Sequence, residues 1–243
     1  MKEIYFKEIG SFFGSIIGYV VAGVFLLTLG MILWVFPDYS ILYYNYASLD
    51  SFFFIAPVVF FFLIPAITMG MFAEEHRSGT MELLLTKPLT TAQVVWGKVL
   101  ASFTLVMLIL LPTVVYYYSV YQLGSPKGNL DTGGILGSYI GLIFLAFSFV
   151  AIGVFSSAIT KSQIVGFLIA TLLIITMYWG WGLMAKIPIF SGIWDDFVAS
   201  FGIDKHYISI RRGVLDTRDI MYFLSVGLGY VMATIFVLNI KRK

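Results

Sequence analysis

The chain carries few side chains with the chemistry of catalysis or metal binding. It has no cysteine, and its two histidines, His76 and His206, lie far apart without ligand spacing. It also lacks the Gly-x-x-x-x-Gly-Lys-[Ser/Thr] phosphate loop and the His-Glu-x-x-His and Gly-x-Ser-x-Gly motifs. The sequence therefore predicts neither an ATPase nor a hydrolase of the common intramembrane kinds.

The densest group of polar and charged residues lies in the segment 74–92. Gly79 is suited to end one helix, and Thr80 is suited to cap a short second one that Pro88 stops. Thr90 and Gln93 then have capping-box spacing for the start of another helix. The segment is predicted to be a short helix held between two turns.

The chemistry of this segment is that of a binding surface. Its acidic and basic side chains can pair with charges on a partner outside the membrane, and its methionine and leucines can make apolar contacts. On residues alone, an ordinary loop whose leucines dip into the membrane interface is an equal alternative. The candidate binding residues are Glu74, Glu75, Arg77, Gly79, Thr80, Met81, Glu82, Leu84, Leu85, Lys87 and Pro88.

The composition predicts that most of the chain lies in lipid. Apolar residues make up 60% of the sequence and charged ones 12%, with a mean hydropathy of +0.95. Six stretches are continuously apolar, free of charged residues and long enough for a transmembrane helix: 9–37, 51–73, 99–126, 132–160, 162–185 and 220–240. No charge lies deep inside them, which argues against an ion-coupled secondary transporter. The predicted spans are about 15–36, 52–73, 93–121, 134–158, 163–184 and 220–239.

The positive charges predict that both termini lie in the cytoplasm. That orientation places 9 of the 15 lysines and arginines inside and 6 outside. Five of the six outer ones belong to the long segment 186–219, so the bias over short loops is 9 to 1.

Two further elements are expected outside the spans. Residues 1–13 have apolar positions at helical spacing and are predicted to form an interfacial helix, with a frayed tail as the alternative. The segment 186–219 is too apolar for a plain loop. A pair of re-entrant half-helices at the outer face fits it, and an amphipathic interfacial helix fits nearly as well.

One run of residues resembles the signature of ABC-2-type transporter permeases. Glu75 precedes Gly79-Thr80, then come Glu82-Leu83-Leu84-Leu85 and Pro88, and Gly97-Lys98 opens the third span. In that family the corresponding element is a coupling helix that docks into a groove on the ATP-hydrolysing subunit. The resemblance extends over the whole chain.

The resemblance implies a single permease domain, residues 1–243, with an all-α integral membrane fold. It would have six transmembrane helices, the interfacial helix, a cytoplasmic coupling helix and the outer re-entrant region. The implied partners are cytoplasmic ABC ATPase subunits and a second permease-like or auxiliary membrane subunit. That second subunit would be either another copy of this chain, giving a homodimer, or a different chain, giving a heterodimer. ATP and Mg²⁺ would be bound by the ATPase partner and no cofactor by this chain, which would not itself be an enzyme. No nucleic acid is implied.

Within that family, the chain is similar to the gliding-motility ABC transporter permeases of Bacteroidota. This narrower likeness rests on overall size and on the stretch 201–219. It implies an exporter in a bacterial inner membrane that works by alternating access. A channel or secondary carrier, and a non-transporting scaffold of a motility or secretion apparatus, are the alternatives.

The predicted orientation can be tested by cysteine labelling, because the native chain has no cysteine. We expect Ser48→Cys to react with an impermeant thiol reagent added outside intact cells, and Ser162→Cys not to react. Labelling of the cysteine at position 162 from outside would overturn the six-span topology.

Overall fold

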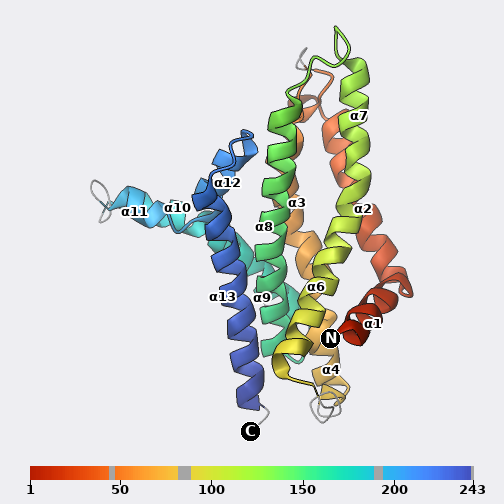
Figure 1. Ribbon diagram of the computed structural model, residues 1–243, viewed down its shortest axis with the longest axis vertical. Helices are drawn as coiled ribbons and strands as arrows, with labels where there is room; N and C mark the ends of the chain where they lie inside the picture. The colour runs from red at the N-terminus through yellow and green to blue at the C-terminus, as the bar shows by residue number, and fades with distance from the viewer. Residues whose placement is uncertain (44–46, 82–88, 189–193, 242–243) are drawn as a thin grey trace.

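The computed structural model describes residues 1–43, 47–81, 89–188 and 194–241, and this part of the chain contains helices and no strand (Figure 1). Six of its helical stretches are long and apolar enough to cross a membrane. The predicted all-α fold with six spans is confirmed. The six stretches are Ile16–Trp34, Asp50–Arg77, Thr91–Leu123, Thr132–Ile159, Gln163–Ala185 and Thr217–Ile240.

Helix α8 (Thr132–Ile159) is the axis of the bundle (Figure 1). It packs against α3 (Asp50–Thr68), α6 (Thr91–Leu110), α9 (Gln163–Ile175) and α13 (Thr217–Lys241). Because α8 is apolar around its whole circumference, neighbours on every side can bury it. In the most apolar stretch of α8, 72% of the residues are buried inside the protein. The corresponding share is 22% for α13 and for α2 (Ile16–Trp34).

Three of the spans are interrupted helices. In the second span α3 is followed by α4 (Gly70–Arg77). In the third, α6 passes through the 3-10 turn η2 (Leu111–Thr113), which contains Pro112, into α7 (Val114–Leu123). In the fifth, α9 passes through the π-helical turn η3 (Thr176–Gly180) into α10 (Trp181–Ala185).

The break between α3 and α4 is stabilised by a serine from the central helix. A helix start leaves N–H groups without intrahelical acceptors. Ser157 Oγ of α8 accepts hydrogen bonds from the N–H groups of Phe72 and Ala73, at 2.9 and 3.0 Å, and donates to the carbonyl of Met69 at 2.8 Å. The second span is therefore fixed to α8 at its break.

Helix α1 (Lys2–Phe13) lies across one end of the bundle and packs on α6 (Figure 1). Gly97 of α6 gives Ile4 room for close approach, and the Tyr5 hydroxyl donates to Thr104 Oγ1 at 3.1 Å. The same end carries α4 and the turn between α8 and α9. We call it the inner end, in keeping with the predicted orientation.

The segment 186–219 contains two short helices, α11 (Asp195–Ala199) and α12 (Ile203–Arg211). Helices α10 and α11 lie side by side and project sideways from the bundle (Figure 1). Helix α12 instead inserts among the spans, where Ile203, Tyr207 and Ile210 are buried. The Tyr207 hydroxyl donates to the carbonyl of Phe53 at 2.8 Å, which ties α12 to α3.

His206 joins α12 to the last span. Its Nδ1 lies 2.7 Å from Asp219 Oδ1 and its Nε2 lies 2.9 Å from the carbonyl oxygen of Ser200. The imidazole ring also stacks on Tyr222, with ring centroids 3.9 Å apart. Both ring nitrogens are thus occupied by polar contacts within the chain. Elsewhere in the chain, the 3-10 turn η1 (Pro37–Tyr39) follows α2.

The contact between α8 and α3 at Gly153 predicts a measurable packing effect. A Cβ at this position would lie 2.1 Å from Thr68 Oγ1 and 2.9 Å from its Cβ. We expect Gly153→Ala to lower the free energy of unfolding by about 1–3 kcal/mol through overpacking. Gly23→Ala in α2 is the control, because no atom lies within 4 Å of a Cβ there. Equal thermal stability of the two purified variants would contradict the packing argument.

Candidate functional site

The described part of the segment 74–92 begins on α4 and turns at its end. Glu74, Glu75 and Arg77 lie on α4, and Gly79 follows with a φ of +69°, a conformation that favours glycine. Thr80 and Met81 come next. The predicted contacts Glu82, Leu84, Leu85, Lys87 and Pro88 lie outside the described residues.

The predicted start of the third span is confirmed. Thr90 Oγ1 accepts a hydrogen bond from the N–H of Gln93 at 3.2 Å. Gln93 Oε1 accepts one from the N–H of Thr90 at 3.1 Å, which completes the capping box.

The candidate residues on and after α4 divide into an outward-facing and an inward-facing set. Glu75 and Met81 are buried, with 8% and 6% of their surface exposed. The other described candidates, together with Ser78, which the sequence analysis did not single out, form a surface that we call the exposed corner. Its residues are Glu74, Arg77, Ser78, Gly79 and Thr80.

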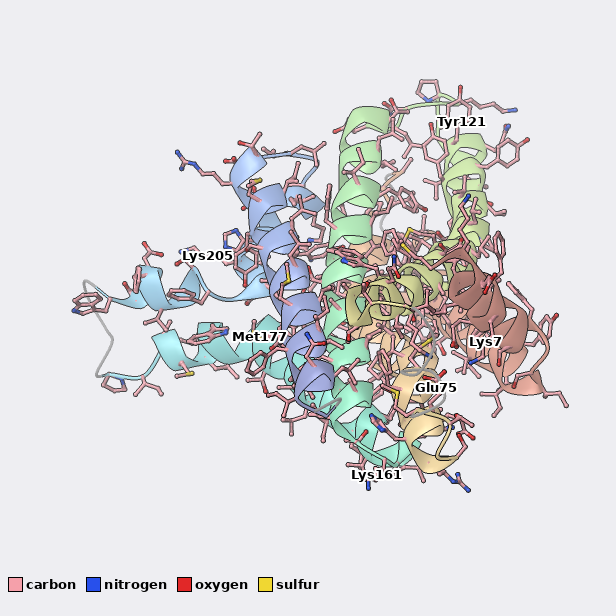
Figure 2. All side chains as sticks on the ribbon, turned by 60° about the horizontal axis from the view of Figure 1, so that its bottom comes forward. Lys7, Glu75, Tyr121, Lys161, Met177 and Lys205 are labelled. Atoms are coloured by element: carbon pink, nitrogen blue, oxygen red, sulfur yellow. The ribbon has the colours of Figure 1, made fainter. Side chains whose placement is uncertain are left out.

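The inward-facing Glu75 belongs to a group of four charges that we call the charge cluster: Lys7, Glu8, Glu75 and Lys98. Lys98 Nζ lies 2.7 Å from Glu8 Oε1 and 3.0 Å from Glu75 Oε1. Lys7 Nζ lies 3.0 Å from Glu75 Oε1 and 3.6 Å from Glu8 Oε1. The cluster joins α1, α4 and α6. Figure 2 shows Lys7 and Glu75 next to one another at the inner end, far from Tyr121.

Lys98 is the centre of the charge cluster. Its side chain is 1% exposed, and a buried ammonium must find its counter-charges and acceptors inside the protein. Its three N–H groups are matched by Glu8, Glu75 and the carbonyl of Met71. The Phe72 ring lies 5.0 Å from the nitrogen and adds a cation–π contact.

Lys7 sits at the open side of the charge cluster. Its side chain is 61% exposed. Burial lowers the pKa of Lys7, but Glu75 and Glu8 raise it by more, so the pKa lies above its usual value. Lys7 therefore stays protonated. Together with Lys98 it places two ammonium groups beside the two carboxylates.

Sequence reasoning found only part of this site. The sequence predicts Glu75 as a polar contact for a soluble partner, and it offers Gly97-Lys98 only as part of the family signature. It does not indicate Glu8 as part of the site, because 90 residues separate Glu8 from Lys98. The one available signal was the position of Lys98 within the third span, where a charge needs a partner.

The site shows no arrangement for metal chemistry. Among the described residues there is no group of three histidine, cysteine, aspartate or glutamate side chains that could hold a metal ion. What the site does offer is a set of ion pairs between three helices and, beside it, an exposed polar corner.

A comparison with protein families shows the family to which the chain belongs. A family model described as ABC-2 family transporter protein matches residues 2–239. The chain belongs to the ABC-2 family. No curated protein matches the sequence. As an ABC-2 permease, the chain is the membrane-spanning subunit of an ABC transporter, in which a separate partner subunit carries the ATPase.

The charge cluster predicts a strong effect of removing its central charge. Lys98→Met would leave Glu8 and Glu75 with only the exposed Lys7 between them. We expect a loss of about 3–5 kcal/mol in the free energy of unfolding, the usual cost of breaking a buried pair. Thermal unfolding of the purified permease would measure it.

The matched control is Lys161→Met, which removes the same charge from the exposed turn between α8 and α9. We expect that change to stay within about 0.5 kcal/mol. Adding Glu8→Gln and Glu75→Gln to Lys98→Met should recover part of the loss. If Lys98→Met is as stable as the control, the charge cluster does not hold the three helices together.

Proposed function

We propose that this ABC-2 permease is the membrane subunit of an ATP-driven exporter and that the segment 74–92 couples it to cytoplasmic ATPase subunits. The observation that carries the proposal is the exposed corner at the inner end, within a chain that matches the ABC-2 family over residues 2–239. The corner presents a carboxylate, a guanidinium and two hydroxyls, and a soluble partner can pair with each of these groups.

The connections of the exposed corner support a coupling role. It follows α4 directly, and α4 is fixed to α8 through Ser157 and to α1 and α6 through the charge cluster. Glu74 also accepts a hydrogen bond from Gln163 Nε2 at the start of α9. A displacement of the corner would therefore reach the central helix and its neighbours without passing through a flexible linker.

Three finer assignments belong to the same proposal. Both termini would lie in the cytoplasm of a bacterial inner membrane, as the bias of positive charges indicates. A second permease-like subunit would complete the pathway, and the partner ATPase subunits would bind ATP and Mg²⁺. A role in gliding motility is supported by the likeness of the stretch 201–219 to the gliding-motility ABC transporter permeases of Bacteroidota.

The coupling role can be tested by placing a charge in the predicted apolar contact. We expect Leu84→Asp to abolish co-purification with the ATPase subunits, because an unpaired charge buried in a contact costs several kcal/mol. The control is Leu123→Asp. That position is 59% exposed at the end of α7, which is the opposite end of the bundle. We expect this variant to retain the ATPase.

Two results would count against the proposal. If Leu84→Asp inserts normally and still recruits a fully stimulated ATPase, the segment 74–92 does not couple the subunits. If the intact complex hydrolyses ATP without moving any substrate across vesicle membranes, a scaffold role replaces the exporter. A channel or secondary carrier would instead function with no ATPase partner.

A further inference from the structure

The N-terminal half of α12 is held in place by hydrogen bonds to the last span and to the turn before α12 (Figure 1). His206 Nδ1 lies 2.7 Å from Asp219 Oδ1, and His206 Nε2 lies 2.9 Å from the carbonyl oxygen of Ser200. The Tyr222 hydroxyl donates to the carbonyl of Phe201 at 2.6 Å. Two of these three hydrogen bonds therefore depend on one imidazole ring.

The two partners of the His206 ring determine which protons it carries. A carboxylate and a carbonyl oxygen both accept hydrogen bonds and have no proton to donate. A neutral imidazole has one N–H and one lone pair, so it can satisfy only one of the two oxygens. Both distances are those of hydrogen bonds, and both ring nitrogens must then be donors. The geometry is that of a positively charged imidazolium.

The surroundings of the ring stabilise this positive charge. Asp219 is 8% exposed, and among the described residues His206 is the one cation within ion-pair distance of it. The ring stacks on Tyr222 with an angle of 18° between the planes, and the face of an aromatic ring attracts a cation. Asp204 on α12 is a second carboxylate that interacts with His206, while Lys186 at the end of α10 acts on Asp204. The His206 side chain is 19% exposed, so it can exchange protons with solvent.

The other side of α12 is held by contacts that do not depend on a titrating group. The Tyr207 hydroxyl donates to the carbonyl of Phe53, and Ser138 Oγ donates to the carbonyl of Arg211 at 2.8 Å. Neither hydroxyl loses its proton near neutral pH. Loss of the His206 contacts would therefore free the N-terminal half of α12 and leave its C-terminal half attached to α3 and α8.

We infer that His206 is a pH-sensitive contact, which holds α12 against the last span only while both ring nitrogens carry a proton. Raising the pH removes one N–H, which leaves one oxygen facing a lone pair and Asp219 without its counter-charge. The N-terminal half of α12 then separates from α13, and the turn at Ser200 moves with it. In the predicted orientation this end of the bundle faces the outside, so the contact responds to the pH there. The inference does not depend on coupling to an ATPase.

The protonation state can be measured on the full-length permease, because the chain has only two histidines. In the His76→Gln variant, histidine labelled with ¹⁵N reports on His206 alone by NMR. We expect both ring nitrogens to be protonated at about pH 5.5 and one of them to lose its proton as the pH is raised to about 9.5. A neutral ring at the lower pH, or a ring that stays charged at the higher one, would overturn the inference.

A distance measurement follows the movement of the helix. The chain has no cysteine, so spin labels can be attached to Asp195→Cys on α11 and Met232→Cys on α13, which are exposed positions. We expect a single distance at low pH and a longer one at high pH, exchanging over the pH range in which the ring loses its proton. A distance that stays constant, or that changes while the ring remains charged, would contradict the inference.

Two substitutions separate the proton on the ring from other effects of pH. In Asp219→Asn the side-chain amide can donate to a neutral Nδ1 while Nε2–H still reaches Ser200, so we expect the short distance at both pH values. His206→Phe can still stack on Tyr222 but has no N–H, so we expect the longer distance at both. Asp204 is present in both variants and controls for its own titration. A pH response that persists in Asp219→Asn, or a short distance in His206→Phe, would show that the His206 protons do not hold α12.

Discussion

The burial of one lysine ammonium constrains the inner half of this ABC-2 permease. Lys98 is 1% exposed within a membrane-spanning helix, and neither lipid nor water can compensate its charge there. Glu8 must come from α1 and Glu75 from α4 to neutralise it. The positions of α1, α4 and α6 relative to one another are therefore set by electrostatics, in a region where apolar contacts alone would leave them free to slide.

The same region shows how polar groups substitute for hydrophobic packing in a membrane bundle. Between helices in lipid, burial of apolar surface gives little preference for one arrangement, so close contacts and hydrogen bonds decide the geometry. Ser157 fixes the break in the second span, and Gly153, about one turn earlier on α8, lets α3 and α8 approach closely. Tyr207 performs the equivalent task for α12 through the carbonyl of Phe53. Each contact depends on one polar or small residue: Ser157 and Gly153 on α8, and Tyr207 on α12.

The spans were predictable because their signal is local. A charge-free run of sufficient length predicts a membrane helix without reference to any other part of the chain, and the capping box at Thr90 is equally local. The charge cluster was not predictable, because its members are distant in sequence and each has an ordinary surface role by itself. Glu75 illustrates this: on α4 its neighbours Glu74 and Arg77 are exposed, while it points inward. The insertion of α12 among the spans was hidden for the same reason, since only the fold brings Tyr207 to Phe53.

The charge cluster also bears on how the chain is made. Membrane helices enter the bilayer in the order of synthesis, so Glu8 and Glu75 arrive before Lys98 does. Until the third span is inserted, Lys7 is the one lysine of the charge cluster that can pair with Glu8 and Glu75. The charge cluster is therefore complete only when the third span is in place, and a nascent chain that stops short of Lys98 would leave Glu8 and Glu75 without their buried counter-charge.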